Sequence, residues 1–79
     1  METKVAVISI IVTDSDRVDV LNDLLHEHSK HIIGRMGIPY QEKGINIISI
    51  AIDAPVDEID SLNSALDSLD GINAKVTYA

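Results

Sequence analysis

Residues 5–12 of this chain read VAVISIIV, and residues 45–52 repeat the same character as INIISIAI. Both stretches consist mostly of β-branched residues and are too short for typical helices, so each is predicted to be a β-strand. Neither alternates cleanly between apolar and polar residues. In the first stretch, Val5 and Val7 fall on one face of the strand and Ile8 falls on the other. Both strands are therefore expected to carry apolar side chains on two faces.

Two stretches have the apolar spacing of amphipathic helices. The first spans about residues 16–28 and follows a cluster of N-cap residues at 13–16. The second begins at Pro55, a residue favoured at helix starts, and ends before Gly71, which supplies a C-terminal stop. Because each helix follows one of the two apolar strands, the chain contains two strand-then-helix units.

Two further strands complete the predicted sheet. Residues 31–40 and the polar turn at 41–44 form a strand and a hairpin turn that leads into the next strand. Residues 72–78 alternate strictly between apolar and polar side chains, as in an edge strand with one face in water. Through right-handed crossovers, the order β-α-β-β-α-β predicts a ferredoxin-like α+β sandwich, with a four-stranded antiparallel sheet and both helices on one face. The first and third strands are expected to be central, and residues 1–79 to form one domain.

The helices can cover only one face of this sheet, yet the central strands carry Val and Ile on both. A sheet face of that size left apolar in water would drive association. We therefore expect a homo-oligomer, either a dimer or a tetramer, of identical subunits. The alternative is a monomer in which small residues such as Ser9, Ser49 and Ala51 make the uncovered face tolerable.

The composition excludes several classes of function. Thirteen acidic and six basic side chains in 79 residues give a formal net charge of −7, which repels nucleic acids and other polyanions. The absence of Cys removes disulfides, thiolate nucleophiles and Cys-ligated metal sites, and the absence of Phe and Trp makes an aliphatic core necessary. The first residues lack a signal-peptide pattern and the longest apolar run is too short to span a bilayer, so a cytoplasmic protein without membrane contact is expected.

The least ordinary segment is Gly-Arg-Met-Gly-Ile-Pro-Tyr at residues 34–40. An arginine on a strand between two glycines presents a planar guanidinium to which an anion or a partner carboxylate has close access. We therefore expect contacts with an effector or with another subunit from Gly34, Arg35, Gly37 and Tyr40.

The direction of Arg35 follows from the alternation of side chains along a strand. If Ile32, Met36 and Ile38 face the helices, Arg35 projects from the opposite, open face of the sheet. There it would pair with a carboxylate of another subunit or contact an anionic effector. The alternative is that the glycines mark a bulge on an edge strand and that Arg35 is solvated.

A second candidate site is the run HEHSKH at residues 26–31. His28 and His31 converge on one metal ion if the helix ends near Ser29, so a His-based metal-binding module or metallochaperone is the alternative function. Imidazoles at a helix C-terminus are also favoured by the helix dipole alone. The sequence has neither a Ser/His/Asp spacing motif nor a Gly-rich phosphate loop, so we expect neither an enzyme nor a cofactor.

Five short runs match a known family: IGRMGIPY at residues 33–40, EKGI at 42–45, IIS at 47–49, DEI at 57–59 and LDGI at 69–72. Through these runs the chain resembles the iron-only hydrogenase system regulators over nearly its whole length. The resemblance implies an ACT-like domain, similar in architecture to the effector domain of nickel-responsive repressors. It also implies a regulatory role.

The chain departs from the nickel-responsive repressors in two ways. Those proteins bind metal through several His and one Cys, whereas this chain has no Cys. They also carry a basic ribbon-helix-helix domain ahead of the effector domain, whereas this sequence begins directly with its first strand. We therefore expect no DNA-binding element of its own, and regulation through a small-molecule effector or a protein partner that binds at the interface of the homo-oligomer.

Overall fold

The computed structural model describes residues 2–79, which form four strands and two α-helices in the order βαββαβ, joined in part by short 3₁₀ turns. In chain order the elements are β1 (Lys4–Val12), η1 (Ser15–Arg17), α1 (Val18–Glu27), η2 (Ser29–His31), β2 (Ile32–Tyr40), η3 (Gln41–Lys43), β3 (Ile45–Ala54), α2 (Val56–Asp67) and β4 (Ile72–Tyr78).

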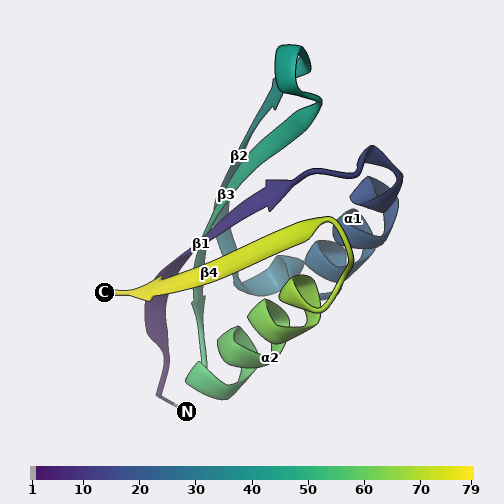
Figure 1. Cartoon of the computed structure of the whole chain (residues 1–79). Coiled ribbons are helices and arrows are strands. Elements are labelled where there is room, and N and C mark those ends of the chain that lie inside the picture. The colour runs from purple at the N-terminus through teal and green to yellow at the C-terminus, as the bar shows by residue number, and fades with distance from the viewer. Residues whose placement is uncertain (1) are drawn as a thin grey trace.

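The four strands form one antiparallel sheet in the order β2-β3-β1-β4, and both helices lie on the same side of it (Figure 1). The two strands predicted to be central, β1 and β3, pair along their length, with Ile8 opposite Ile50. The predicted edge strands, β2 and β4, are at the two edges. The ferredoxin-like α+β architecture predicted from the sequence is therefore confirmed.

An aliphatic core lies between the sheet and the helices. Every second residue of β1 and β3 points into it, and each helix contributes the apolar side of its surface. No polar or charged residue among residues 2–79 is buried, so burial of apolar surface stabilises this core. The buried hydrophobic residues that form the core are Ala6, Ile8, Ile10, Val12, Leu21, Leu25, Ile48, Ile50, Ile52, Ala54, Ile59, Leu62, Leu66, Ile72 and Ala74.

The first helix is shorter than the predicted range of 16–28. The carboxylate of Asp14 accepts a hydrogen bond of 3.0 Å from the backbone N–H of Asp16. This contact closes a tight 3₁₀ turn at Ser15–Arg17 before the α-helix begins. A second 3₁₀ turn, Ser29–His31, follows the end of α1 and leads the chain into β2.

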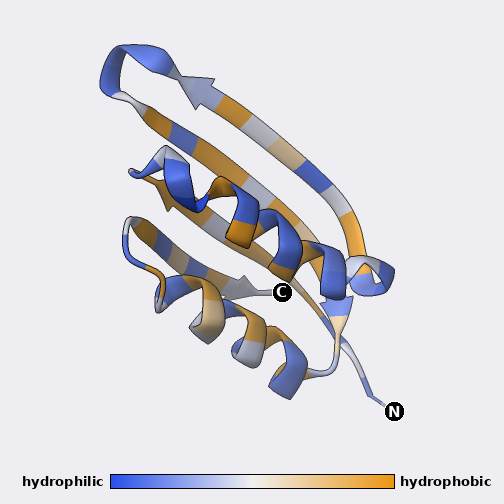
Figure 2. Ribbon diagram, turned by 90° about the vertical axis from the view of Figure 1, so that its right-hand side faces the viewer, coloured by the Kyte–Doolittle hydropathy of each residue, from blue (hydrophilic) through white to orange (hydrophobic). Residues whose placement is uncertain are grey.

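The β2–β3 hairpin reaches beyond the rest of the molecule (Figure 1). β1 pairs with β3 only as far as Val12 opposite Asn46, whereas β2 and β3 continue to the pair of Tyr40 and Ile45. The molecule is elongated, with extents of 42 × 19 × 18 Å. The end of the hairpin is hydrophilic, as expected of a turn surrounded by water (Figure 2).

Candidate functional site

One side of the sheet has no helix over it, and we call this surface the open face. Its side chains alternate with those of the core along each strand. The open face consists of Val5, Val7, Ser9 and Ile11 of β1, Gly34, Met36, Ile38 and Tyr40 of β2, Ile45, Ile47, Ser49, Ala51 and Asp53 of β3, and Asn73, Lys75 and Thr77 of β4.

The open face is apolar over its centre and over β2. Ile11, Ile47 and Ile38 stand side by side across three strands. Val7 is 40% exposed, Ile38 51% and Met36 61%. These large apolar side chains are the second hydrophobic face predicted for the central strands, and within one chain they remain in contact with water.

The direction predicted for Arg35 is wrong, because β2 contains a bulge before it. The register moves from Ile32 opposite Ile52 to Gly34 opposite Ala51, so β2 has one extra residue at this point. An extra residue turns every later side chain of the strand to the other face. Arg35 therefore lies on the helix side of the sheet, opposite the buried Ile50, while Met36 and Ile38 lie on the open face.

Arg35 reaches across to the first helix. Its Nη2 donates a hydrogen bond of 2.7 Å to Oδ1 of Asn22 on α1. Two hollows adjoin the arginine, with volumes of about 470 Å³ and about 230 Å³. We call these two hollows together the α1–β2 cleft. Besides Arg35, the larger hollow is lined by Asn22, Asp23, Leu25, His26, Ser29 and Ile32, and the smaller is lined by Val18, Gly37, Ile38, Pro39, Asn46 and Ile48.

The structure divides the four predicted site residues between the two sides of β2. Arg35 and Gly37 border the α1–β2 cleft. Gly34 and Tyr40 lie on the open face, where the Tyr40 hydroxyl donates a hydrogen bond of 3.1 Å to Glu42 Oε2. One short strand thus presents chemically different surfaces on its two sides, a polar cleft and an apolar face.

The histidine run does not form a cluster typical of a metal site. Nε2 of His31 lies 2.9 Å from Oε2 of Glu58, and this contact joins the 3₁₀ turn η2 to the start of α2. Within residues 2–79, no group of three or more His, Asp or Glu side chains is arranged to hold a metal ion. Nothing in this arrangement favours the alternative based on His28 and His31.

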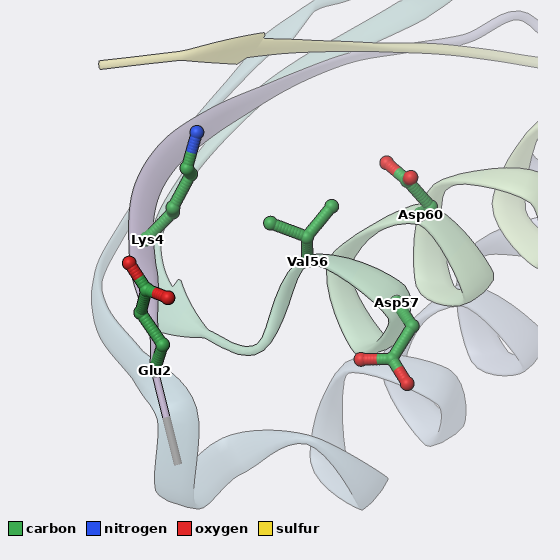
Figure 3. A pocket seen from close by; sticks show the side chains of 5 residues that line it. All are labelled: Glu2, Lys4, Val56, Asp57 and Asp60. Carbon is green, nitrogen blue, oxygen red and sulfur yellow. The ribbon is translucent and has the colours of Figure 1, made fainter.

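A cavity of about 450 Å³ lies between the start of β1 and α2, and sequence reasoning missed it. Figure 3 shows Glu2 and Lys4 on one side, with Val56, Asp57 and Asp60 of α2 on the other. The acidic start of α2 is also what the helix dipole favours, so these residues form no sequence pattern that indicates a cavity. The residues come from distant parts of the chain, and only the folded arrangement brings them together.

Asp60 also anchors the last strand. The hydroxyl of Tyr78 on β4 donates a hydrogen bond to Asp60 Oδ1. That hydrogen bond, followed by desolvation and the charge of Asp60, raises the pKa of Tyr78 from 10.0 to about 12. Between pH 10.0 and about 12, the hydroxyl of Tyr78 therefore stays protonated in the folded protein and is ionised in the unfolded chain.

Titration of Tyr78 is expected to lower stability at high pH. From pH 10.0 to about 12 the folded state binds more protons at this residue than the unfolded state, so the free energy of unfolding falls as the pH rises. Tyrosinate absorbance of a Tyr40→Phe variant follows Tyr78 alone. We expect its midpoint near pH 12, and Asp60→Asn should return it toward 10.0. A midpoint near 10.0 in the Tyr40→Phe variant itself would contradict the hydrogen bond.

The fold and the site define a small ferredoxin-like domain with an uncovered apolar sheet face and a polar cleft beside β2. The model of the TM1266-like family, described as "Iron-only hydrogenase system regulator, putative", matches residues 4–76, and the chain belongs to this family. The resemblance identified from the sequence is thereby confirmed.

A solved structure supports the same assignment. The uncharacterized protein TM1266 from Thermotoga maritima superposes with a TM-score of 0.93 and 27% sequence identity, over 98% of each chain. No match was found among curated proteins. None of the helices within residues 2–79 has the length and apolar character needed to cross a membrane.

Proposed function

We propose that this chain is a regulatory module of the iron-only hydrogenase system that assembles as a homo-oligomer through its open face and binds a small effector, or a protein partner, beside β2. The family supports the regulatory role. The observation that carries the assembly is the apolar centre of the open face, where Val7, Ile38 and Ile47 are 40%, 51% and 39% exposed. Exposed apolar surfaces of this extent mark sites of association.

The size of the open face supports a second copy of the chain as its cover. Four strands at a spacing of about 4.8 Å, each rising about 3.3 Å per residue, give a flat footprint of roughly 500 Å². Side-chain relief makes the accessible surface larger than this footprint. Standard interfaces bury about 800 Å² per partner. Pairing of two open faces therefore brings the buried area close to what a stable dimer needs.

The strand β2 offers a route by which an effector would influence assembly. Arg35 and Gly37 border the α1–β2 cleft, whereas the intervening Met36 belongs to the open face. A ligand that fixes β2 against α1 also fixes the position of Met36. If that position favours the assembled form, the ligand shifts the equilibrium between free and assembled chains. This coupling is a mechanism for regulation that needs no change of fold.

The charge of the chain favours a protein or a small molecule as the regulated contact. A formal net charge of −7 repels nucleic acids. A regulatory effect on gene expression would consequently pass through another protein. The proposed module senses a ligand and presents a changed surface to that protein.

A charge placed on the open face is expected to break the assembly. In a two-fold dimer, Val7→Lys removes apolar burial twice and introduces two ammonium groups, so the dissociation constant should rise by about a hundredfold or more. The matched control is Val20→Lys, because Val20 is 41% exposed, like Val7 at 40%, but lies on α1. Sedimentation velocity over a range of concentrations measures both variants.

Two results would contradict the proposed assembly. One is an unmodified chain that sediments as an 8.6 kDa monomer at micromolar concentration. The other is an equal loss of assembly in Val7→Lys and Val20→Lys, which would place the contact elsewhere. Circular dichroism of each variant establishes that it is folded before its assembly is compared.

A further inference from the structure

Arg35 is a cation that forms no direct salt bridge with any carboxylate of residues 2–79, although the chain is strongly acidic. Within residues 2–79, the close contacts between a basic side chain and a carboxylate join Arg17 to Asp14 and His31 to Glu58, and neither involves Arg35. Its one hydrogen bond to another side chain goes to the neutral amide of Asn22. A guanidinium has five N–H donors, so most of them remain available to a ligand. Thirteen acidic side chains are present, and none of them lies within 4 Å of this guanidinium, although Asp23 borders the same hollow.

The surroundings of Arg35 have the volume and the mixed character of a small-molecule site. The larger hollow, of about 470 Å³, lies within the range of roughly 300–1,000 Å³ that such sites occupy. The smaller hollow is bordered by the apolar side chains of Val18 and Ile48. Asp23 contributes a negative charge to the larger hollow. The α1–β2 cleft thus offers one cation, a neighbouring amide and an apolar wall.

We propose that the α1–β2 cleft binds a small monocarboxylate with a short, branched aliphatic chain, an inference that rests on the effector-binding role proposed above. The planar carboxylate matches the fork of donors on Arg35, and the amide of Asn22 supplies a further N–H. The aliphatic chain packs against Val18 and Ile48. Asp23 and the net charge of −7 disfavour more highly charged anions such as phosphate.

A charged ligand and a neutral ligand of nearly the same shape test this proposal. Two-dimensional NMR of the full chain is recorded during titration with isovalerate and, separately, with isovaleramide. We expect saturable shifts at Asn22 and Arg35 with the acid, and binding of the amide that is weaker by about tenfold to a hundredfold, since a charge-assisted hydrogen bond is lost. Equal binding of the two, or no saturable shift with isovalerate, would overturn the proposal. So would stronger binding of inorganic phosphate.

Variants of the chain separate Arg35 from general charge effects. Arg35→Gln removes the charge at the cleft and should weaken isovalerate binding by about tenfold or more. Lys43→Gln removes a charge at the far end of the hairpin and should leave binding unchanged. If both substitutions have the same effect, the ligand responds only to net charge and the assignment to the cleft is wrong.

The two glycines of β2 provide a second, matched pair. A Cβ at Gly37 would lie 3.9 Å from Ile48 Cγ1, and a Cβ at Gly34 would have no atom within 4 Å, so both positions accept a side chain. Gly37→Val fills the smaller hollow and should reduce isovalerate binding, whereas Gly34→Val points to the open face and should not. Sedimentation of the unmodified chain distinguishes the two proposals. A monomer that binds isovalerate contradicts only the assembly, and an oligomer that does not bind it contradicts only the ligand.

Discussion

Replacing Ile50 by alanine is expected to lower the free energy of unfolding by about 2–5 kcal/mol. Ile50 is fully buried and lies on the central strand β3, with Ile8 beside it on β1. Truncation removes apolar contacts from the middle of the core and leaves a cavity that rigid neighbouring strands fill only in part. A domain of this size has only a few kcal/mol of stability, so the variant should be largely unfolded at moderate temperature. Urea denaturation followed by circular dichroism measures the change.

The control for Ile50→Ala is the same substitution on the same strand but on the other face. Ile47 is 39% exposed on the open face. At concentrations where the chain is monomeric, Ile47→Ala should cost about 1 kcal/mol or less, as surface substitutions usually do. Its cost should grow with protein concentration if a second copy covers this face. Equal costs for the two variants in the monomer would show that the assignment of the two faces is wrong.

The fold was predictable because the central strands and the helices have strong and independent patterns. The sequence predicts that β1 carries apolar side chains on both of its faces. In the structure, Ile8 and Ile10 on one face are fully buried, whereas Val7 on the other face is 40% exposed. The boundary between α2 and β4 was also predictable, because a glycine after a helix favours its end. In the structure, Gly71 has the positive φ of 80° that favours glycine. Local chemistry and global architecture agree at these positions.

The direction of Arg35 was not predictable, and the reason is physical. Alternation locates the faces of a strand only where one face is buried and the other is not. Apart from the half-buried Ile32, all residues of β2 are exposed, so its sequence carries no pattern that sets which residues face the helices. The bulge between Ile32 and Gly34 then reverses the alternation without a change in composition. The sequence pointed to Arg35 and Gly37, but the structure was needed to show that α1 brings Asn22 beside Arg35.

The α1–β2 cleft and the open face follow from this reversal. Without the bulge, Arg35 would stand among the apolar side chains of the open face, where burial of its charge in an interface would be costly. With the bulge, Met36 and Ile38 join that face instead, and the guanidinium lies beside Asn22. A single extra residue in β2 therefore separates an apolar surface suited to association from a polar cleft suited to an anion.

Replacing Gly71 by alanine is expected to destabilise the protein by several kcal/mol. With φ at 80°, an alanine pays about 1–3 kcal/mol for a left-handed backbone. Its Cβ would also lie 2.6 Å from the Cβ of Asp14 and 3.3 Å from the backbone nitrogen of Asp14, so the chain must shift. Overpacking of this kind typically costs a further amount of about 1–3 kcal/mol. The backbone N–H of Thr13 donates a 2.7 Å hydrogen bond to the Gly71 carbonyl, which ties the two segments together. Thermal and urea denaturation measure the loss.

Gly44→Ala separates the two contributions to the Gly71→Ala penalty. Gly44 has a similar φ of 63°, but no atom lies within 4 Å of a Cβ built there. Its substitution should therefore cost only the backbone share, about 1–3 kcal/mol. The excess penalty at Gly71 then measures the contact with Asp14, whose carboxylate holds the 3₁₀ turn before α1. If the two substitutions cost the same, Asp14 yields to the added methyl group without penalty, and the expected overpacking at Gly71 is wrong.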